Sequence, residues 1–344
     1  MPRKRKSAKD AWIPPRVYRG KSAYEFHPKG GGAVRLCDLD ANPALVIKRW
    51  EQERERIDRE RQSSLNALCA EFQQSEAWFK LATGTRSDYG FCHDQLMPVF
   101  GKMNPDKIKP EHIRKYMDTR GRHSPVRANR EKAYLSKVYS WAYERGKVII
   151  NPVKGVKKFT ETARDRYITD DEYHRTYSAA SVALKVAMEI SYLCAARRGD
   201  VLKLERSQIL EEGIFIQQGK TGKKQIKAWT DRLRAAVKLA SKIPGATSSK
   251  YLIHNKFGST YTPAGFRSIW NKAKEKAKKE AEKENIDLDT SFTFHDIKAK
   301  GISDFEGNLA EKQQFSGHKT QSQVNTYDRK TAVVRSLDKP LPAK

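Results

Sequence analysis

The stretch Gly213-Ile-Phe-Ile-Gln-Gln-Gly-Lys-Thr-Gly-Lys-Lys224 nearly matches a nucleotide-binding loop, and its flanks decide what it folds into. Gly219-Lys220-Thr221 fits the end of the pattern G-x-x-x-x-G-K-[ST], but five residues, where the pattern has four, separate the two glycines. Such a loop also needs a strand before it and a helix directly after Lys-Thr. Here the strand-like residues 214–216 lie between the glycines, and the alternating residues 225–229 predict a second strand. The stretch therefore predicts a β-hairpin with Lys220 near its tip.

The composition points to a polyanionic partner. The 344 residues carry a formal net charge of +27, from 68 Lys and Arg against 41 Asp and Glu. A chain of this length is enough for about two or three domains. Its charge favours nucleic acid over an acidic membrane surface, because neither a lipidation signal nor a long apolar span is evident. A merely basic, soluble protein is the alternative.

The four cysteines show no CxxC pairing, and no secretory leader precedes them. We therefore expect reduced thiols in a cytoplasmic protein. The opening residues 1–6, Met-Pro-Arg-Lys-Arg-Lys, predict a disordered basic arm that contacts phosphates.

The chain is expected to contain three domains, at residues 1–62, 63–160 and 163–344. In the first, strands at 17–19, 24–27 and 33–37 are separated by glycine-containing turns and followed by a helix from about Pro43 to Arg61. Two interpretations of this small basic sheet-plus-helix module remain open: a DNA-binding module, or a scaffold with solvated charges.

The second domain is predicted to be helical. Apolar residues recur at helical spacing, and a helix start is expected at 108–113. Asn151-Pro152 is expected to stop the last helix, and 153–160 to form a basic linker. The residues expected on apolar faces are Leu65, Leu68, Phe72, Tyr134, Val138 and Trp141. The basic residues that could follow a phosphate backbone are Arg120, Arg122, Arg127, Arg130 and Lys132.

The third domain mixes helices with the hairpin. We expect helices after Asp170, at 182–193, where the sequence is strongly apolar, and at 262–284, whose mixed charges indicate a solvated face. The predicted fold class is therefore α+β and mostly helical.

Four local features of this third domain share one chemical logic. The first is Leu193-Cys-Ala-Ala-Arg-Arg-Gly-Asp-Val-Leu-Lys-Leu204, where Asp200 stands three residues after Arg197, a spacing suited to orienting the guanidinium. The second is Lys220 of the hairpin. The third is Phe294-His-Asp-Ile-Lys298, with His295 and Lys298 one helical turn apart. The fourth is Phe315-Ser-Gly-His318, followed nine residues after the histidine by Tyr327.

In this order, the four features resemble the motifs of the tyrosine recombinases, most closely of the phage-type integrases. Residues 193–204 are similar to that family's first arginine box, and Gln218-Gly-Lys-Thr-Gly222 to its β-hairpin lysine. His295-Asp-Ile-Lys298 is similar to its H-x-x-R box. Ser316-Gly-His-Lys-Thr320 with Tyr327 resembles its L-G-H-[ST] box and nucleophile. Each motif is weak alone, but their order and spacing together are specific.

The resemblance implies phosphodiester transfer through a 3′-phosphotyrosine intermediate, without metal, ATP or another cofactor. Tyr327 would be the nucleophile. Arg197, Lys298 and His318 would stabilise charge on the phosphate oxygens, with Asp200 in a supporting role. Lys220 would give a proton to the leaving 5′-oxygen, and His295 would assist proton transfer at the tyrosine.

Lys298 departs from the family pattern, which most often has an arginine there. Lysine keeps the charge but loses the bidentate fork that grips a phosphate. Either it still serves as a point charge, or the exchange slows or abolishes the reaction.

The resemblance also implies the setting. The expected partners are double-stranded DNA attachment sites and three further copies of the chain in a tetramer on DNA, together with a host DNA-bending protein and a directionality factor. Phage or genomic-island integration and excision in the bacterial cytoplasm, at the nucleoid and away from membranes, is the implied role. The N-terminal module resembles an arm-site DNA-binding module, and the helical domain a core-site binding domain. The tail 332–344 is expected to pack onto a neighbouring protomer.

Two other function classes remain open: a non-catalytic DNA-binding regulator on the same scaffold, and a DNA-relaxing topoisomerase of the IB type. Each residue also has a plain structural interpretation. Tyr327 is one of 14 tyrosines, His318 alone would more often be a capping or core residue, and Arg197 a solvated base. The joint order of the motifs favours the catalytic interpretation.

Overall fold

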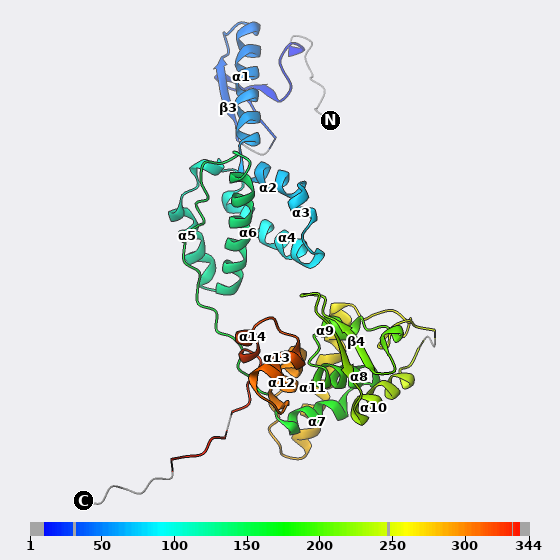
Figure 1. Cartoon of the computed structure of the whole chain (residues 1–344). Coiled ribbons are helices and arrows are strands. Elements are labelled where there is room, and N and C mark those ends of the chain that lie inside the picture. Colours follow the sequence, from blue (N-terminus) through cyan, green and yellow to red (C-terminus); the bar gives the residue numbers. More distant parts are fainter. Residues whose placement is uncertain (1–9, 30–31, 246–247, 332, 338–344) are drawn as a thin grey trace, which may run out of the picture. The chain divides into compact units, whose positions relative to one another are not determined.

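The computed structural model describes residues 10–29, 32–245, 248–331 and 333–337 (Figure 1). The basic arm expected at residues 1–6 lies outside these ranges. The chain divides into two units, residues 1–162 and 163–344, which are described separately below. The finer division of the first unit near residue 62 stays a prediction. No helix in the described ranges has the length and apolarity that a membrane span requires.

The first unit begins with a three-stranded antiparallel sheet of order β1-β2-β3. The strands are β1 (Val17–Arg19), β2 (Ala23–Phe26) and β3 (Val34–Asp38), and helix α1 (Pro43–Gln62) follows. A small apolar cluster that includes Val17, Phe26 and Val46 joins the sheet to the helix. The predicted strands and helix are confirmed to within one or two residues.

Five α-helices with a common apolar core complete the first unit. They are α2 (Leu65–Gln73), α3 (Glu76–Phe79), α4 (Thr83–Phe100), α5 (Pro110–Gly121) and α6 (Pro125–Tyr143). All six residues predicted on apolar faces in this part of the chain are buried in that core.

Helix α6 ends earlier than predicted. It stops at Tyr143 rather than at Asn151-Pro152. Gly146 adopts the left-handed conformation at φ 63°, and the amide of Lys147 donates to the carbonyl of Ala142. This glycine-dependent reversal satisfies the last carbonyls of the helix, so the helix ends before the proline is reached.

The expected linker at 153–160 is also wrong in part, because these residues pack against the helical core. Val153 is fully buried. The side chain of Asn129 holds the backbone of Phe159 in both directions, donating to its carbonyl and accepting from its amide, each at 2.9 Å.

Three of the basic residues expected to follow a phosphate backbone face carboxylates instead. Arg120 pairs with the buried Glu131, Arg127 with Asp88, and Arg130 with Glu161. Their charge is therefore largely neutralised within the unit. In the described ranges, Arg122 and Lys132 have no carboxylate partner within ion-pair distance.

The second unit surrounds the buried helix α8 (Val182–Leu193), which α10 and α12 contact. Its strands β4 (Gly213–Gln217) and β5 (Lys224–Ala228) form the predicted antiparallel hairpin, with Gly213 opposite Ala228. Gly222 has φ 71° in the turn, which glycine adopts without strain. The other helices are α7 (Asp170–Ala179), α9 (Arg198–Leu202), α10 (Asp231–Leu239), α11 (Pro263–Lys283), α12 (Phe294–Asp304), α13 (Leu309–Ser316) and α14 (Gln321–Asn325).

Helix α12 is fixed against α8 by close backbone contact and is tied to α7 by an ion pair of the buried Lys300. A Cβ atom on Gly301 would lie 2.2 Å from the carbonyl oxygen of Tyr192, so only glycine permits this approach. The neighbouring Lys300 is buried and its ammonium lies 2.6 Å from Asp170 and 2.9 Å from Asp304. The side chains that α12 carries are thus held in a defined position.

We expect Gly301→Ala to destabilise the second unit by about 1–3 kcal/mol, because the added methyl group forces α12 away from α8. Gly90→Ala is the matched control, since a Cβ there meets nothing within 4 Å in α4. It should stabilise the protein by about 0.5–1 kcal/mol through helix propensity. Urea unfolding of both variants measures this. Equal effects of the two substitutions would contradict the close contact.

Candidate active site

Tyr327 follows the short helix α14 and lies against the first turn of α12. Its hydroxyl is 3.0 Å from Nε2 of His295, and the two rings meet edge to face with centroids 5.5 Å apart. The tyrosine is half-buried. Burial lowers the pKa of His295, and the charge of Lys298 lowers it further, so the imidazole is neutral near pH 7. A neutral imidazole at this distance can accept the phenolic proton.

His318 covers the other side of the tyrosine ring. The rings stack with centroids 4.8 Å apart and an interplanar angle of 27°. Nδ1 of His318 lies 2.8 Å from the hydroxyl of Ser316, whereas Nε2 is buried without a hydrogen-bond partner among the described residues. Burial, followed by the charges of Lys298 and Arg197, lowers the pKa of His318 to about 4. This nitrogen is therefore free to bond to a ligand atom or a water molecule.

Lys298 is the buried cation of the site, with 1% of its surface exposed. Its ammonium donates to the carbonyl of Ala195 at 2.6 Å and lies 5.7 Å from the centroid of the Tyr327 ring. Burial lowers its pKa to about 7, and the positive charges of Arg197 and Lys227 add to this effect. Ala195, at φ 49°, adopts the left-handed conformation that places its carbonyl there. An ammonium with this pKa is poised to gain a bound anion as its counter-ion.

Arg197 directly precedes α9 and donates to the side-chain oxygen of Gln218 at 2.6 Å. The expected contact with Asp200 is absent: the carboxylate of Asp200 accepts from the amide of Gly219 at 2.9 Å instead. The reason is local geometry. Arg197 is in extended conformation, at φ −74° and ψ 147°, so the three-residue helical spacing does not bring the two side chains together. Asp200 thus supports the hairpin rather than the arginine.

Gln218 joins three parts of the site, although its sequence context predicts no role for it. Besides accepting from Arg197, its amide donates to the carbonyl of Ser316 at 2.9 Å. The hydroxyl of Thr221 donates to its oxygen at 3.0 Å. The buried glutamine therefore connects the arginine segment, the hairpin and the turn that holds His318. Its position just before Gly-Lys-Thr was the only available signal.

Lys220 is exposed in the turn between β4 and β5, as predicted. It shares a pocket with Arg197 and Lys203. Within the described residues, its ammonium has no hydrogen-bond or ion-pair partner. The hairpin also supplies a second lysine that the motifs did not reveal: Lys227 of β5 donates to the carbonyl of Phe315, and burial lowers its pKa to about 8. Alternation along the strand was its only signal, and this does not distinguish a site lysine from a surface one.

The segment that carries Tyr327 is anchored on its C-terminal side by a buried ion pair. Arg329 donates to Asp296 at 2.7 Å, and the two side chains are 6% and 1% exposed. Burial acts against ionisation of Asp296, but bonds from Thr293 and Arg329 outweigh it and lower its pKa. Ser303 adds a backbone anchor, since its hydroxyl donates to the carbonyl of Tyr327 at 3.1 Å and accepts from the amide of Arg329 at 2.7 Å.

A second ion pair holds Asp328, which lies between Tyr327 and Arg329 in the sequence. Lys312 of α13 lies 2.7 Å from the carboxylate of Asp328. Both residues that follow Tyr327 are therefore tied to the same pair of helices, α12 and α13. The tyrosine is in this way fixed beside His295 and His318 before any ligand arrives.

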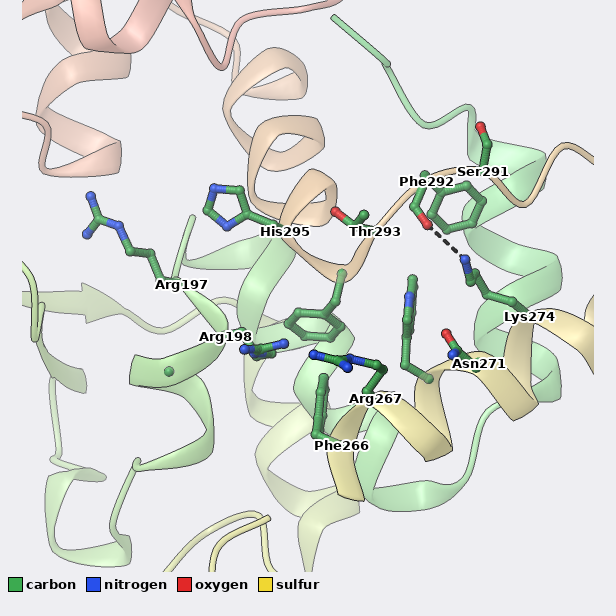
Figure 2. Close-up of a pocket in the computed structure, with 13 residues that line it drawn as sticks. Arg197, Arg198, Phe266, Arg267, Asn271, Lys274, Ser291, Phe292, Thr293 and His295 are labelled. Carbon is green, nitrogen blue, oxygen red and sulfur yellow. Dashed lines mark hydrogen bonds between the residues drawn. The ribbon is translucent and has the colours of Figure 1, made fainter. Parts of the chain in front are cut away.

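Besides this cluster, the site opens into a pocket of about 580 Å³ that Arg197 and His295 border together with Arg198 and Arg267 (Figure 2). In the described ranges, no group of three or more His, Cys, Asp and Glu side chains is arranged to hold a metal ion. The arrangement as a whole is a nucleophilic hydroxyl beside a neutral base and several cations. It is suited to a phosphate or a similar anion.

We expect Arg329→Met to lower the free energy of unfolding by about 3 kcal/mol, because it leaves the buried carboxylate of Asp296 without its closest cation. Adding Asp296→Asn should recover part of this loss, since the unpaired charge is then removed. Arg335→Met, which removes a charge from the exposed tail, should stay within about 0.5 kcal/mol of the parent. Urea unfolding of the parent, these three variants and Asp296→Asn alone tests the pair. Strictly additive effects of the two buried substitutions would show that the ion pair does not stabilise the fold.

Comparison with known proteins gives consistent results. The model of the phage integrase family matches residues 166–333. The integrase of Escherichia phage HK022 is 26% identical over 206 residues, which are 57% of this chain and 56% of that protein. The integrase of Escherichia phage lambda is 29% identical over 96 residues, 27% of each chain. The matched stretches thus span about half of these curated relatives or less.

Solved structures show the same fold. The crystal structure of a lambda integrase dimer bound to a COC′ core site has a TM-score of 0.67 and 18% identity, and the match covers 95% of this chain and 99% of that one. A lambda integrase tetramer bound to a Holliday junction has a TM-score of 0.64 and 17% identity over 90% and 97% of the two chains. The α+β, mostly helical fold class is thereby confirmed. The family match to residues 166–333, the curated integrases and this shared fold together support a phage-type integrase of the tyrosine recombinases.

Proposed function

We propose that this protein is a site-specific DNA recombinase that cleaves and rejoins DNA strands through a 3′-phosphotyrosine intermediate. The observation that carries the proposal is that three side chains converge on Tyr327: His295 at hydrogen-bonding distance, His318 by stacking and Lys298 at cation–π distance. Local sequence spacing brings only some of these residues together. The fold brings all four to one point, as a phosphoryl-transfer site requires.

The reaction follows from the placement of each group. The Tyr327 oxygen attacks the scissile phosphorus and forms the new P–O bond, while its proton passes to Nε2 of His295, 3.0 Å away. The bond from phosphorus to the 5′-oxygen breaks. Lys220, on the exposed hairpin turn, gives a proton to that oxygen. Attack by the 5′-hydroxyl of another DNA strand then reverses these steps and joins new partners.

The remaining cations stabilise the phosphate as its charge redistributes. Arg197 and Lys298 supply positive charge, and the unpartnered Nε2 of His318 supplies a hydrogen-bond donor when its proton lies there. Asp200 and Gln218 act through others: the first holds Gly219 beside Lys220, and the second holds Arg197. The three-domain assignment is part of the same proposal, with residues 1–62 binding arm-type sites and 63–160 binding core-type sites.

The proposed partners are double-stranded attachment sites and further copies of the chain. A lambda integrase with this fold has been solved as a tetramer on a Holliday junction, which supports a tetramer here. Apolar side chains of the tail, Val333, Val334 and Leu337, are almost fully exposed and are available to a neighbouring protomer. Residue 332 and residues 338–344 of the expected tail lie outside the described ranges. A host DNA-bending protein, a directionality factor and action at the bacterial nucleoid complete the proposal.

The regulator alternative is weakened by the geometry. A non-catalytic DNA-binding protein has no need for a clamped tyrosine hydroxyl bonded to a neutral imidazole. A topoisomerase shares the chemistry, and the family membership of residues 166–333 favours recombination over it.

Tyr327→Phe should abolish the covalent protein–DNA adduct, because phenylalanine has no nucleophilic oxygen. The substrates are nicked suicide duplexes made from DNA that flanks the gene, and the readout is a denaturation-resistant adduct. Tyr261→Phe is the control, since Tyr261 is half-buried in the same unit and its hydroxyl has no hydrogen-bond partner among the described residues. Specific binding without any adduct from the wild type would instead support the regulator.

The rate of adduct formation at limiting protein should fall about tenfold per pH unit above pH 7, because Lys298 must be protonated to neutralise the phosphate. Its pKa of about 7 in the free protein places the loss there. In Lys298→Arg the guanidinium stays charged, so the decline should move to higher pH. DNA affinity measured at each pH separates binding from chemistry. Identical pH profiles for the two proteins would remove Lys298 from this role.

A further inference from the structure

The pocket beside the catalytic cluster shares Arg197 and His295 with it, but its other lining residues have no part in the chemistry above. It lies between α9, the start of α11 and the segment that leads into α12, and it has a volume of about 580 Å³. Its rim is polar and basic, whereas buried aromatic residues of the core, including Phe266 and Trp270, contribute its floor. A basic rim over an apolar floor suits a nucleotide unit better than a small inorganic ion, since a sugar or base can cover the apolar part.

Two arginines on the rim lack partners. Arg198 and Arg267 are exposed, and among the described residues neither guanidinium has a hydrogen bond, an ion pair or an aromatic contact. Lys274 of the same pocket differs, because its ammonium is engaged by the carbonyls of Thr290 and Phe292 at 2.8 and 3.1 Å. Among the cations that line the pocket, Arg198 and Arg267 are therefore the two without a partner in the described residues.

These two side chains face each other. Figure 2 shows Arg267, on α11, extending toward Arg198, on α9, at the same pocket. Two like charges that converge repel each other, and a bound anion removes this repulsion. Arginine also offers a planar set of donors that matches phosphate oxygens. The geometry is that of a phosphate clamp.

The clamp is continuous with the catalytic cluster. Arg197 borders this pocket and also the neighbouring pocket that contains Lys203 and Lys220. Cations therefore follow one another from Arg198 and Arg267, past Arg197, to the hairpin. A DNA strand whose scissile phosphate lies at Arg197 would place a flanking phosphate of the same strand in the clamp.

We propose that Arg198 and Arg267 bind one backbone phosphate that flanks the scissile phosphate on the cleaved strand, so that this pocket fixes the register of the strand at Tyr327. The inference rests on the proposed recombinase function and names a subsite of it. The ligand is a phosphodiester of the DNA backbone, with its sugar over the aromatic floor. Neither arginine takes part in bond making or breaking.

The test removes the positive charge of the arginines on the protein side of the contact and the negative charge of single phosphates on the DNA side. Full-length Tyr327→Phe protein, which cannot cleave, is combined with Arg198→Gln and Arg267→Gln together. Duplexes from DNA flanking the gene, chosen because the parent protein retains them, carry one neutral methylphosphonate at each position around the cleavage site in turn. At one flanking position, we expect the methylphosphonate to weaken binding by the parent roughly ten- to hundred-fold, as for the loss of charged hydrogen bonds. In the double arginine variant, the same methylphosphonate should have almost no further effect.

Lys278→Gln and Lys279→Gln together, in place of the two arginine changes, are the matched control. They remove two charges at exposed positions of α11 outside the pocket, and should leave the methylphosphonate pattern unchanged. If the losses from the arginine variant and from the methylphosphonates are additive at every position, the clamp is wrong. The clamp is equally wrong if the double lysine variant gives the pattern of the arginine variant.

Adduct formation by protein with an intact Tyr327 is scored in parallel on unmodified duplexes. Adducts with additive binding losses would overturn the clamp and leave the recombinase function standing. One position with non-additive losses, together with the absence of any adduct, would leave the clamp standing as a DNA-binding subsite. The same result would count against the recombinase function.

Discussion

The buried ammonium of Lys298 is the constraint on which the catalytic unit depends. A cation that is 1% exposed needs an oxygen partner, and the backbone supplies one by placing Ala195 in the left-handed conformation. This bend follows directly after α8, so the strongly apolar helix and the arginine segment meet at the lysine. The contact with α8 at Gly301 then holds α12, which carries the lysine, at the required depth. Arg197 and Lys227 lower the pKa of Lys298 further, so a bound anion would stabilise the charged form of this lysine.

The site combines one rigid part with one that is held more lightly. Tyr327 is fixed by ion pairs on both following residues and by Ser303, so its position requires no induced change. The strands of the hairpin are bonded to α13 by Gln218, Gln225 and Lys227. Its tip, in contrast, is held mainly by the bond between Gly219 and Asp200, and Lys220 there is exposed. A nucleophile benefits from preorganisation, whereas a proton donor must reach a leaving oxygen that appears only as the bond breaks. The distribution of contacts agrees with this division of roles.

Much of the fold could be predicted because its signals are local. The apolar run at 182–193 and the alternation around residues 214–229 indicated α8 and the hairpin within a residue or two. The end of α6 was missed because a glycine reversal near residue 146 acts before the more conspicuous proline. The catalytic candidates were recognisable from motif order. Their partners were not: the pairing of Arg329 with Asp296 and the bridge made by Gln218 join residues far apart in sequence, and no spacing rule encodes them. The prediction for Asp200 failed for a related reason, since its spacing from Arg197 assumed a helix that begins one residue later.

The position of Arg329 also bears on where the chain can be shortened. The exposed tail begins at residue 331, only four residues beyond the nucleophile, and a stop placed directly after Asp328 would remove the arginine along with the tail. Asp296, next to His295 on α12, would then lose its closest cation, and Tyr327 would become the penultimate residue of a loose end. Loss of activity in such a truncated protein would be mistaken for evidence of contacts between protomers. The boundary that separates tail from active site therefore falls after Lys330. The last element that the catalytic fold needs is the ion pair of Arg329 with Asp296, not a helix.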